Sequence, residues 1–471
     1  MQIYHVSAEC YPVAKVGGLA DVVGALPKYL QKAGAEAKVV MPAYDTKFVQ
    51  QNAFDEVFQG ELTLGWMHFR FQVFKEVNDQ LGFELFLIAI PGLFDRPNVY
   101  SYQDDTERFT SFQIAFLQWL VHTNQQPDVV HCHDHHTGLV PFMMQFCYAF
   151  HPLQHVPTVL TIHNGQYQGW FDFDKMPYLP DFDRSKAGYL EWGGMINPLA
   201  SAIKCVKKVT TVSQSYLYEM MEKANGLENL LKFEQYKSIG ILNGIDQEVW
   251  NPKTDTRIPK NYSVSNFSKG KEANKQWLCE QFSLDASKPL FTFIGRLVWE
   301  KGADILPQSI SLAMQHLSGD FNVIVLGSGD PNLEGEFRQM QQFYPNHFQA
   351  YIGYNEDLAH ALYSGADFLL MPSRVEPCGL NQMYALRYGT IPIVRRTGGL
   401  RDTVIDMGDG GNGICHDQVA VFDIVHSMQR ALELFHQPKE WSSIRKAAMQ
   451  IDHSWERVAQ EYLKLYHELK N

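Results

Sequence analysis

Short apolar runs alternate with helix-periodic stretches along the first half of the chain. The runs are rich in Val, Ile and Leu and lie at 3–7, 37–41, 83–90, 128–133, 158–163 and 207–213. Continuous runs of this kind are typical of parallel strands covered on both faces. The helical periodicity between them, as at 19–32 and 110–122, predicts right-handed βαβ units and an open parallel sheet.

The same alternation restarts after the stretch 250–270, which is rich in Pro, Asn, Ser and Lys. The new apolar runs lie at 290–294, 322–326, 348–352, 366–371 and 391–394. A chain of 471 residues is too long for one ordinary core. We therefore predict an α/β fold with two Rossmann-like, doubly wound parallel-sheet domains facing a deep cleft between them.

The last stretch, 454–470, predicts a helix whose apolar face packs against a core. Its stripe consists of Trp455, Val458, Ala459, Tyr462, Leu463, Tyr466 and Leu469. We place domain boundaries at 1–245 for the first domain and 246–452 for the second. The terminal helix, 453–471, is expected to cross back to the first domain.

Composition and charge narrow the class of protein. Hydrophobic residues make up 45% and aromatic residues 13%, which suffices for two cores. The formal charge of −12 argues against a nucleic-acid partner, which needs a basic face. No stretch of 18 apolar residues predicts a membrane span, and the first residues lack the features of a signal peptide. The seven scattered cysteines indicate reduced thiols and a cytoplasmic location.

A carboxylate follows one of the second-half strands. The run 366–371 leads into Pro372-Ser373-Arg374-Val375-Glu376-Pro377-Cys378-Gly379-Leu380, and a helix-periodic run continues to Gly389. Pro377 suits the first turn of that helix and Gly389 its C′ position. Ligands of α/β sheets bind at the carboxyl ends of strands, so Glu376 and the amides of Cys378 and Gly379 are candidate ligand groups. An ordinary βα loop with a solvated Glu is the alternative.

Three other loops carry glycines, and two of them also carry basic residues. Lys15-Val16-Gly17-Gly18-Leu19 opens the first long helix, and Thr397-Gly398-Gly399-Leu400 precedes another. Exposed amides at a helix start suit phosphate oxygens, although a tight turn also needs glycine. Arg296 and Lys301 flank the loop after the first strand of the second domain, where both could reach a diphosphate. A solvated surface pair is the alternative for these two residues.

A histidine cluster, His131-Cys132-His133-Asp134-His135-His136, raises the possibility of zinc. Strand alternation would place His131, His133 and His135 on one face, but no nearby His or Cys spacing completes a tetrahedral set. The alternative is that the strand ends here and Asp134 projects toward a ligand, where a carboxylate can stabilise positive charge at an anomeric carbon. His163 ends the next strand and could donate to a sugar, or could be a buried core histidine.

Taken in order, these motifs together with Leu242-Asn243-Gly244-Ile245-Asp246 resemble the bacterial glycogen synthase and plant starch synthase family. These are retaining glucosyltransferases of the two-Rossmann (GT-B) type, and the resemblance covers essentially the whole chain. It implies transfer of glucose from ADP-glucose to the non-reducing end of an α-1,4-glucan such as glycogen. UDP-glucose as donor, with a glucan or small-sugar acceptor, is the alternative. The oligomeric state is left open.

The resemblance also implies roles for single residues. Lys15 and the amides of Gly17 and Gly18 would lie near the donor phosphates, which Arg296 and Lys301 would neutralise. Glu376 would hold glucose hydroxyls with the Cys378 and Gly379 amides, and Asp134 would lie near the reacting centre. His163 and Asn243 would line the glucose pocket, and Tyr354 would stack on the nucleobase. The remaining donor-binding residues carried over are Asn164, Leu380, Asn381, Thr397 and Gly398.

No metal or other cofactor is expected, because cationic side chains would neutralise the diphosphate. Three positions depart from the family pattern: His135 stands where Trp is usual, Asn381 where Thr is common, and Gln166 in a loop that is usually more apolar. Two other classes compete with this reading. A non-catalytic glucan or nucleotide binder would lack the charged set of Asp134, Arg296, Lys301 and Glu376. A nicotinamide oxidoreductase would carry a GxGxxG fingerprint, which is missing.

Overall fold

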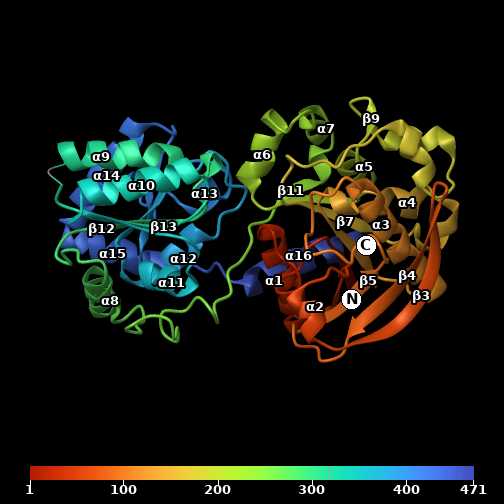
Figure 1. Cartoon of the computed structure of the whole chain (residues 1–471), viewed down its shortest axis with the longest axis horizontal. Coiled ribbons are helices and arrows are strands. Elements are labelled where there is room, and N and C mark those ends of the chain that lie inside the picture. Colours follow the sequence, from red (N-terminus) through yellow and green to blue (C-terminus); the bar gives the residue numbers. More distant parts are fainter. Residues whose placement is uncertain (318, 471) are drawn as a thin grey trace. The chain divides into compact units, whose positions relative to one another are not determined.

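The computed structural model describes residues 1–317 and 319–470, and the chain folds into two compact units (Figure 1). Unit 1 comprises Met1–Leu242 and Trp455–Asn471, and unit 2 comprises Asn243–Ser454. The sequence-based boundaries were 245/246 and 452/453, and the terminal helix belongs to unit 1 as expected. The cleft expected between the domains stays a prediction.

Unit 1 is built on a nine-stranded sheet with the order β11-β10-β7-β6-β1-β2-β5-β4-β3. All of its pairs are parallel except β3 with β4 and β4 with β5. A separate pair, β8 and β9, is antiparallel. The strands are β1 Gln2–Val6, β2 Glu36–Pro42, β3 Phe54–Leu64, β4 Met67–Glu76, β5 Glu84–Ala89, β6 Val129–His133, β7 Thr158–Ile162, β8 Glu191–Trp192, β9 Met195–Ile196, β10 Lys208–Thr211 and β11 Ser238–Gly240.

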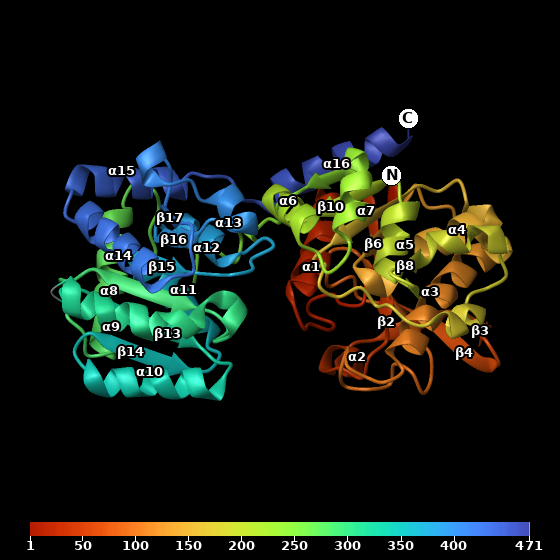
Figure 2. The ribbon, with the colours of Figure 1, turned by 90° about the horizontal axis from the view of Figure 1, so that it is seen from above.

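The helices of unit 1 connect these strands and cover the sheet. They are α1 Gly18–Lys32, α2 Lys47–Gln51, α3 Asp105–His122, α4 Val140–Phe146, α5 Pro198–Cys205, α6 Gln214–Glu222, α7 Glu228–Phe233 and α16 Trp455–Lys470. Helix α16 lies along α1 (Figure 2). Its Trp455, Val458, Tyr462 and Tyr466 share a buried core with Ile3. The predicted apolar stripe is therefore confirmed, and it packs on the sheet that begins the chain.

Unit 2 is a six-stranded, all-parallel sheet with the order β14-β13-β12-β15-β16-β17. This is the strand order 3-2-1-4-5-6 of the Rossmann fold, with its switch point between the first and fourth strands. The strands are β12 Leu290–Ile294, β13 Asn322–Gly327, β14 Phe348–Ile352, β15 Phe368–Met371, β16 Ile391–Arg395 and β17 Ile414–His416. The helices are α8 Phe267–Gln281, α9 Leu306–His316, α10 Pro331–Phe343, α11 Glu356–Gly365, α12 Asn381–Tyr388, α13 Gly398–Thr403, α14 Val421–Phe435 and α15 Pro438–Met449.

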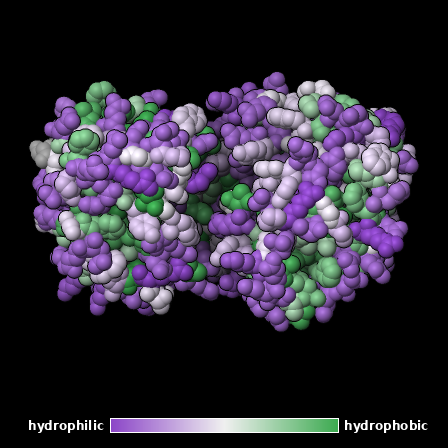
Figure 3. All heavy atoms as spheres, in the orientation of Figure 1, coloured by the Kyte–Doolittle hydropathy of each residue, from purple (hydrophilic) through white to green (hydrophobic). Residues whose placement is uncertain are grey.

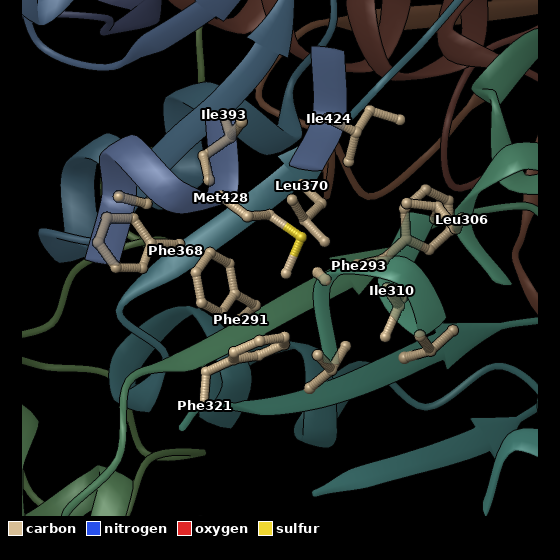
Figure 4. Close-up of a cluster of buried hydrophobic side chains, with 14 of the residues drawn as sticks. Phe291, Phe293, Leu306, Ile310, Phe321, Phe368, Leu370, Ile393, Ile424 and Met428 are labelled. Carbon is tan, nitrogen blue, oxygen red and sulfur yellow. The ribbon is translucent and has the colours of Figure 1, made fainter. Parts of the chain in front are cut away.

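Alternate residues of β12 point into two different cores. Phe291 and Phe293 pack with Leu306 and Met428 under α9 and α14 (Figure 4). Leu290 packs on the other face with residues of α8 and α11. Both faces of the sheet are thus apolar, which explains why its strands read as continuous apolar runs in the sequence.

The surface of each unit is mainly hydrophilic in the view of Figure 3. Among the described residues, none of the helices has the length and hydropathy that crossing a bilayer requires.

Two expectations about local structure were wrong. The long antiparallel hairpin β3–β4 was not predicted, because most of its side chains are at least partly exposed and the strands form no continuous apolar run. Helix α12 begins at Asn381, with Leu380 as N-cap. Pro377 therefore lies in the preceding loop, and so do Cys378 and Gly379. Gly389, at φ 70°, does take the predicted C′ position.

Candidate active site

In unit 2 the loops that follow β12 and β15 lie side by side, because these two strands are neighbours at the switch point of the sheet. A Cβ at Gly302 would lie 2.2 Å from the Pro372 carbonyl oxygen. The amides of Arg374 and Val375 both donate to the carbonyl of Glu300. The two loops are thus joined backbone to backbone, with no room for a side chain at Gly302.

A third loop, which opens α13, presses against the second. A Cβ at Gly398 would lie 2.1 Å from the Glu376 carbonyl oxygen, and one at Gly399 would lie 2.0 Å from that of Cys378. The amide of Gly399 donates to the carbonyl of Glu376 at 3.0 Å. Gly398 also has φ +44°, a conformation that side chains rarely adopt. Gly398 and Gly399 therefore support the Glu376 loop directly, and Thr397 precedes them as the N-cap of α13.

The joined loops bring Lys301 to Glu376. Lys301 Nζ lies 2.8 Å from Oε1 and 2.6 Å from Oε2 of the carboxylate. Ser373 Oγ donates to Oε2 at 3.1 Å. The Glu376 side chain is 8% exposed and that of Lys301 27%. A nearly buried carboxylate is thereby paired with a cation that keeps contact with solvent.

The other predicted residues of unit 2 fall into two groups. Arg296 and Tyr354 are exposed, and Tyr354, which follows β14 with only Gly353 between, is 85% accessible. Asn243 is buried beside Cys378: burial raises the pKa of the Cys378 thiol to about 12, and a hydrogen bond from the Asn243 backbone opposes that shift. Asn381 Nδ2 donates to the carbonyl of Ile294 at 2.7 Å, so the amide group anchors the end of β12.

In unit 1 the corresponding switch point lies between β1 and β6, and Asp134 follows β6 there. Asp134 has φ 57° and ψ −174°, a conformation that is strained for any residue except glycine. Its Oδ1 accepts from the amide of His163 at 2.7 Å and from that of Asn164 at 3.4 Å. Burial raises the pKa of Asp134 to about 7, the two amides lower it, and the nearby Glu9 raises it.

The loop before α1 is held by Glu9, which was not among the residues predicted from the sequence. Glu9 is buried, and its Oε2 accepts from the amides of Val16 and, at 2.9 Å, of Gly17. Tyr100 donates to Oε1 at 2.6 Å. The Gly17 amide is therefore already bonded to a carboxylate, which corrects the expectation that it is open to phosphate. A carboxylate just after the first strand was the signal that could have pointed to Glu9.

Lys15 lies beside this loop, with Nζ 2.6 Å from Asp21 Oδ1 and its side chain 46% exposed. Exposed ion pairs of this kind contribute little to stability and exchange partners readily. Gly17 is the N-cap of α1 and Gly18 its first residue, as predicted. An anion could thus be held here by Lys15 and the helix start at Gly18.

The histidine cluster has a different composition from the predicted one. Strand β6 ends at His133. His135 therefore lies outside the strand, in a 3-10 turn that ends at Thr137. The group whose ring nitrogens come within 4.8 Å of one another consists of His5, His131 and His133. His5 was missed because it lies 126 residues earlier, on β1, which pairs with β6 at His5 and His131.

The fold and these two sets of residues define a class of protein. Two Rossmann-like units, each with charged and glycine-containing loops at the carboxyl ends of its strands, are the architecture of GT-B glycosyltransferases. Residues 2–233 match the family described as starch synthase catalytic domain, and residues 278–448 match glycosyl transferases group 1.

Curated relatives and solved structures agree with this class. The chain is 58% identical over 466 residues to a glycogen synthase of Flavobacterium johnsoniae, covering 99% of this chain and 98% of the relative. It is 38% identical to a glycogen synthase of Streptococcus pneumoniae, with both chains covered completely. The chain belongs to the bacterial glycogen synthase and plant starch synthase family.

Among solved structures, the catalytic domain of starch synthase IV from Arabidopsis thaliana, bound to ADP and acarbose, superposes with a TM-score of 0.87. It is 32% identical, with 100% of this chain and 99% of that chain covered. A sucrose-phosphate synthase from Thermosynechococcus elongatus superposes with a TM-score of 0.60 at 17% identity, covering 99% of this chain and 98% of that chain, and supports the fold alone.

Proposed function

We propose that this protein is a glycogen synthase that transfers glucose from ADP-glucose to the non-reducing end of an α-1,4-glucan, with retention of configuration. The observation that carries the proposal is the full-length likeness to a starch synthase structure that holds ADP and acarbose. ADP is the leaving group of ADP-glucose, so a site for ADP is a site for this donor.

The residues of unit 2 have the chemistry that a nucleotide-sugar donor needs. In the proposal Arg296 and Lys301 neutralise the departing diphosphate, because a guanidinium and an ammonium can follow charge as it builds on the phosphates. Glu376, held in place by Lys301 and Ser373, accepts hydrogen bonds from glucose hydroxyls. Tyr354 stacks on the adenine. The remaining residues that complete or support the donor site are Asn243, Cys378, Gly379, Leu380, Asn381, Thr397 and Gly398.

The residues of unit 1 supply the groups for the reacting sugar. Asp134 stabilises the positive charge that develops at the anomeric carbon, and its strained backbone keeps the carboxylate in one place. His163 and Asn164 line the glucose pocket, and Lys15 with Gly18 contacts the donor phosphates. We extend the proposal to a reaction without a metal ion, because the four cationic and acidic side chains already handle the charge.

The tested reaction is glucan elongation. The protein is incubated with glycogen and either ADP-glucose or UDP-glucose, and both nucleotide release and the length of the glucan product are measured. We expect faster turnover with ADP-glucose than with UDP-glucose. Addition of a metal chelator should not lower the activity. Elongation with neither donor would contradict the proposal. Preference for UDP-glucose would favour the alternative donor.

A second measurement separates an enzyme from a non-catalytic binder. Lys301→Ala should lower turnover more than it lowers the affinity for glucan, since the ammonium acts on the leaving group. Equal losses in both quantities would favour a binding protein.

We also propose that the protein acts in the cytoplasm. All seven cysteines are buried free thiols in the structure, which suits a reducing compartment.

A further inference from the structure

Three buried histidines of unit 1 form a continuous hydrogen-bonded row that ends at the candidate site. His5 Nδ1 lies 3.1 Å from His133 Nε2, and His133 Nδ1 lies 3.0 Å from His163 Nε2. The first two residues lie on β1 and at the end of β6, and His163 directly follows β7; these three strands are neighbours in the sheet. His5 and His133 have no exposed surface, whereas His163 is 8% exposed.

A fourth buried histidine on the same face, His131, makes a separate set of hydrogen bonds. His131 Nδ1 lies 2.6 Å from the hydroxyl of Tyr466 on α16, and its Nε2 lies 2.6 Å from Thr161 Oγ1. His131 stacks on His133 with ring centroids 4.3 Å apart and planes 19° apart. It thus shares the burial of the row without sharing its hydrogen bonds.

The cluster of His5, His131 and His133 is not arranged to hold a metal ion. His131 lies against the face of His133, with ring centroids 4.3 Å apart and planes 19° from parallel, whereas His5 meets His133 edge to edge, with centroids 5.4 Å apart and His5 Nδ1 3.1 Å from His133 Nε2. The lone pairs of imidazole lie in the ring plane, so stacked rings cannot direct them at one ion. Both ring nitrogens of His131 and of His133 are also bonded within the protein.

Each ring of the row is neutral near pH 7. Burial lowers the pKa of His5 and of His163 to about 3, and burial lowers that of His133 well below its usual value. A neutral imidazole has one N–H and one lone pair. In a row of such rings every donor must therefore point the same way, so only two proton arrangements exist.

The two arrangements differ at the ends of the row. If the donors point from His5 toward His163, all three rings carry the proton on Nδ1 and His5 Nε2 is a bare lone pair. If they point the other way, all three carry it on Nε2 and His5 has a buried N–H. His5 Nε2 is fully buried and has no hydrogen-bond partner among the described residues. Because an orphaned buried N–H is rarer than an orphaned acceptor, the first arrangement is favoured.

We propose that His5 and His133 are positioning residues whose row fixes His163 as the Nδ1–H tautomer, a permanent hydrogen-bond donor to a sugar hydroxyl. The Nδ1–H of His163 then donates a hydrogen bond to a ligand oxygen, and this nitrogen cannot accept one. The identity of that ligand, the glucose of the donor, rests on the proposed function. The tautomer itself is a property of the free protein.

The first test needs no variant. The protein is labelled with ¹⁵N-histidine, and two-bond ¹H–¹⁵N correlations report which ring nitrogen of each of the 18 histidines carries the proton. His163→Gln, His133→Leu and His5→Phe assign the signals by loss. Protons on Nδ1 of all three rings are expected. A proton on Nε2 of His163 would overturn the proposal.

The second test compares matched variants. His133→Leu removes the donor to His163 Nε2, so the His163 signal should shift to a mixture of tautomers and kcat/KM for the donor should fall about three- to tenfold. Tyr466→Phe is the control, because it removes one buried hydrogen bond from the same face and leaves the row intact. It should leave the His163 tautomer and kcat/KM unchanged. An unchanged tautomer in His133→Leu, or an equal change in Tyr466→Phe, would overturn the proposal.

The spectroscopic and kinetic results fail separately. If His163 carries its proton on Nδ1 but the protein does not elongate glucan, the proposed function is wrong and the proposed tautomer of His163 is confirmed. If the protein elongates glucan while His163 carries its proton on Nε2, the proposed tautomer is wrong and the proposed function is supported.

Discussion

Lys301 holds both carboxylate oxygens of Glu376, with Nζ 2.8 Å from Oε1 and 2.6 Å from Oε2. The two residues are 75 positions apart in the sequence and come from loops after different strands. Because the carboxylate is nearly buried, removing either member of such a pair is costly. The pair thus couples the group proposed to orient glucose to the group proposed to neutralise the leaving diphosphate.

Glu376→Gln should lower kcat at least tenfold, because a neutral amide accepts weaker hydrogen bonds from glucose hydroxyls and releases Lys301 from its partner. A loss of one charge-assisted hydrogen bond corresponds to about 1.5–3 kcal/mol. Steady-state kinetics with glycogen and ADP-glucose measure the effect.

The control for this variant is Asp304→Asn, which breaks the ion pair between Asp304 and Arg374 in the same pair of loops. It should reduce stability with a smaller effect on kcat. Full turnover in Glu376→Gln would refute the assigned role of Glu376.

The rate should depend on the ionisation of Asp134. Burial raises the pKa of this carboxyl to about 7, and the proposed role needs its charged form. Protonation therefore removes activity as the pH falls through about 7, and kcat/KM should drop roughly tenfold per pH unit below that point. Glu9→Gln should move this limb to lower pH, since the Glu9 charge raises the pKa of Asp134. A flat profile from pH 6 to 9, measured by nucleotide release, would speak against the assignment.

Asp134→Asn should stabilise the fold at alkaline pH while abolishing turnover. The folded-state pKa of Asp134 lies above its ordinary value of 3.8, so its ionisation costs stability as the pH rises from about 4 to 7. The amide oxygen of Asn can still accept from His163 N without carrying a charge. At pH 8 the variant should gain on the order of a few kcal/mol in unfolding free energy. The gain should disappear below pH 4, and denaturant melts at both pH values test this.

Gly398→Ala should disrupt the support of the Glu376 loop. A Cβ there would lie 2.1 Å from the Glu376 carbonyl oxygen, on a backbone with φ +44°. We expect a loss of about 3 kcal/mol or more in stability together with loss of activity. Gly410→Ala is the matched control, because Gly410 has φ +75° but nothing within 4 Å of its Cβ position. It should cost about 1–2 kcal/mol and leave activity intact. Equal effects would mean that backbone strain alone matters at Gly398.

The central parallel strands of both sheets were predicted from the sequence because they lie between two layers of helices, whereas the short edge strands β11 and β17 were not predicted. Burial on both faces demands continuous apolar residues, and Leu290–Ile294, which is almost entirely buried, was located with its observed bounds. The edge strand Phe348–Ile352 was also located with its observed bounds, although most of its residues are only partly buried. The hairpin β3–β4 lacks such burial and was missed, although an alternating stretch around Gly65 marks it. Helix α12 was found, but its start was placed too early because Pro377 fits a helix start as well as it fits a loop.

The sequence by itself determined the two-domain α/β fold, the family and the loops that carry the chemistry, since each is encoded in contiguous residues. Tertiary structure alone decided the partners: Lys301 with Glu376, Glu9 with the Gly17 amide, and His5 with His133. These pairs depend on the order of strands in a sheet, which places residues from distant segments side by side. Burial in the folded chain also raises the pKa of Asp134 and keeps the histidines of the row neutral, because both effects depend on how much water the fold excludes.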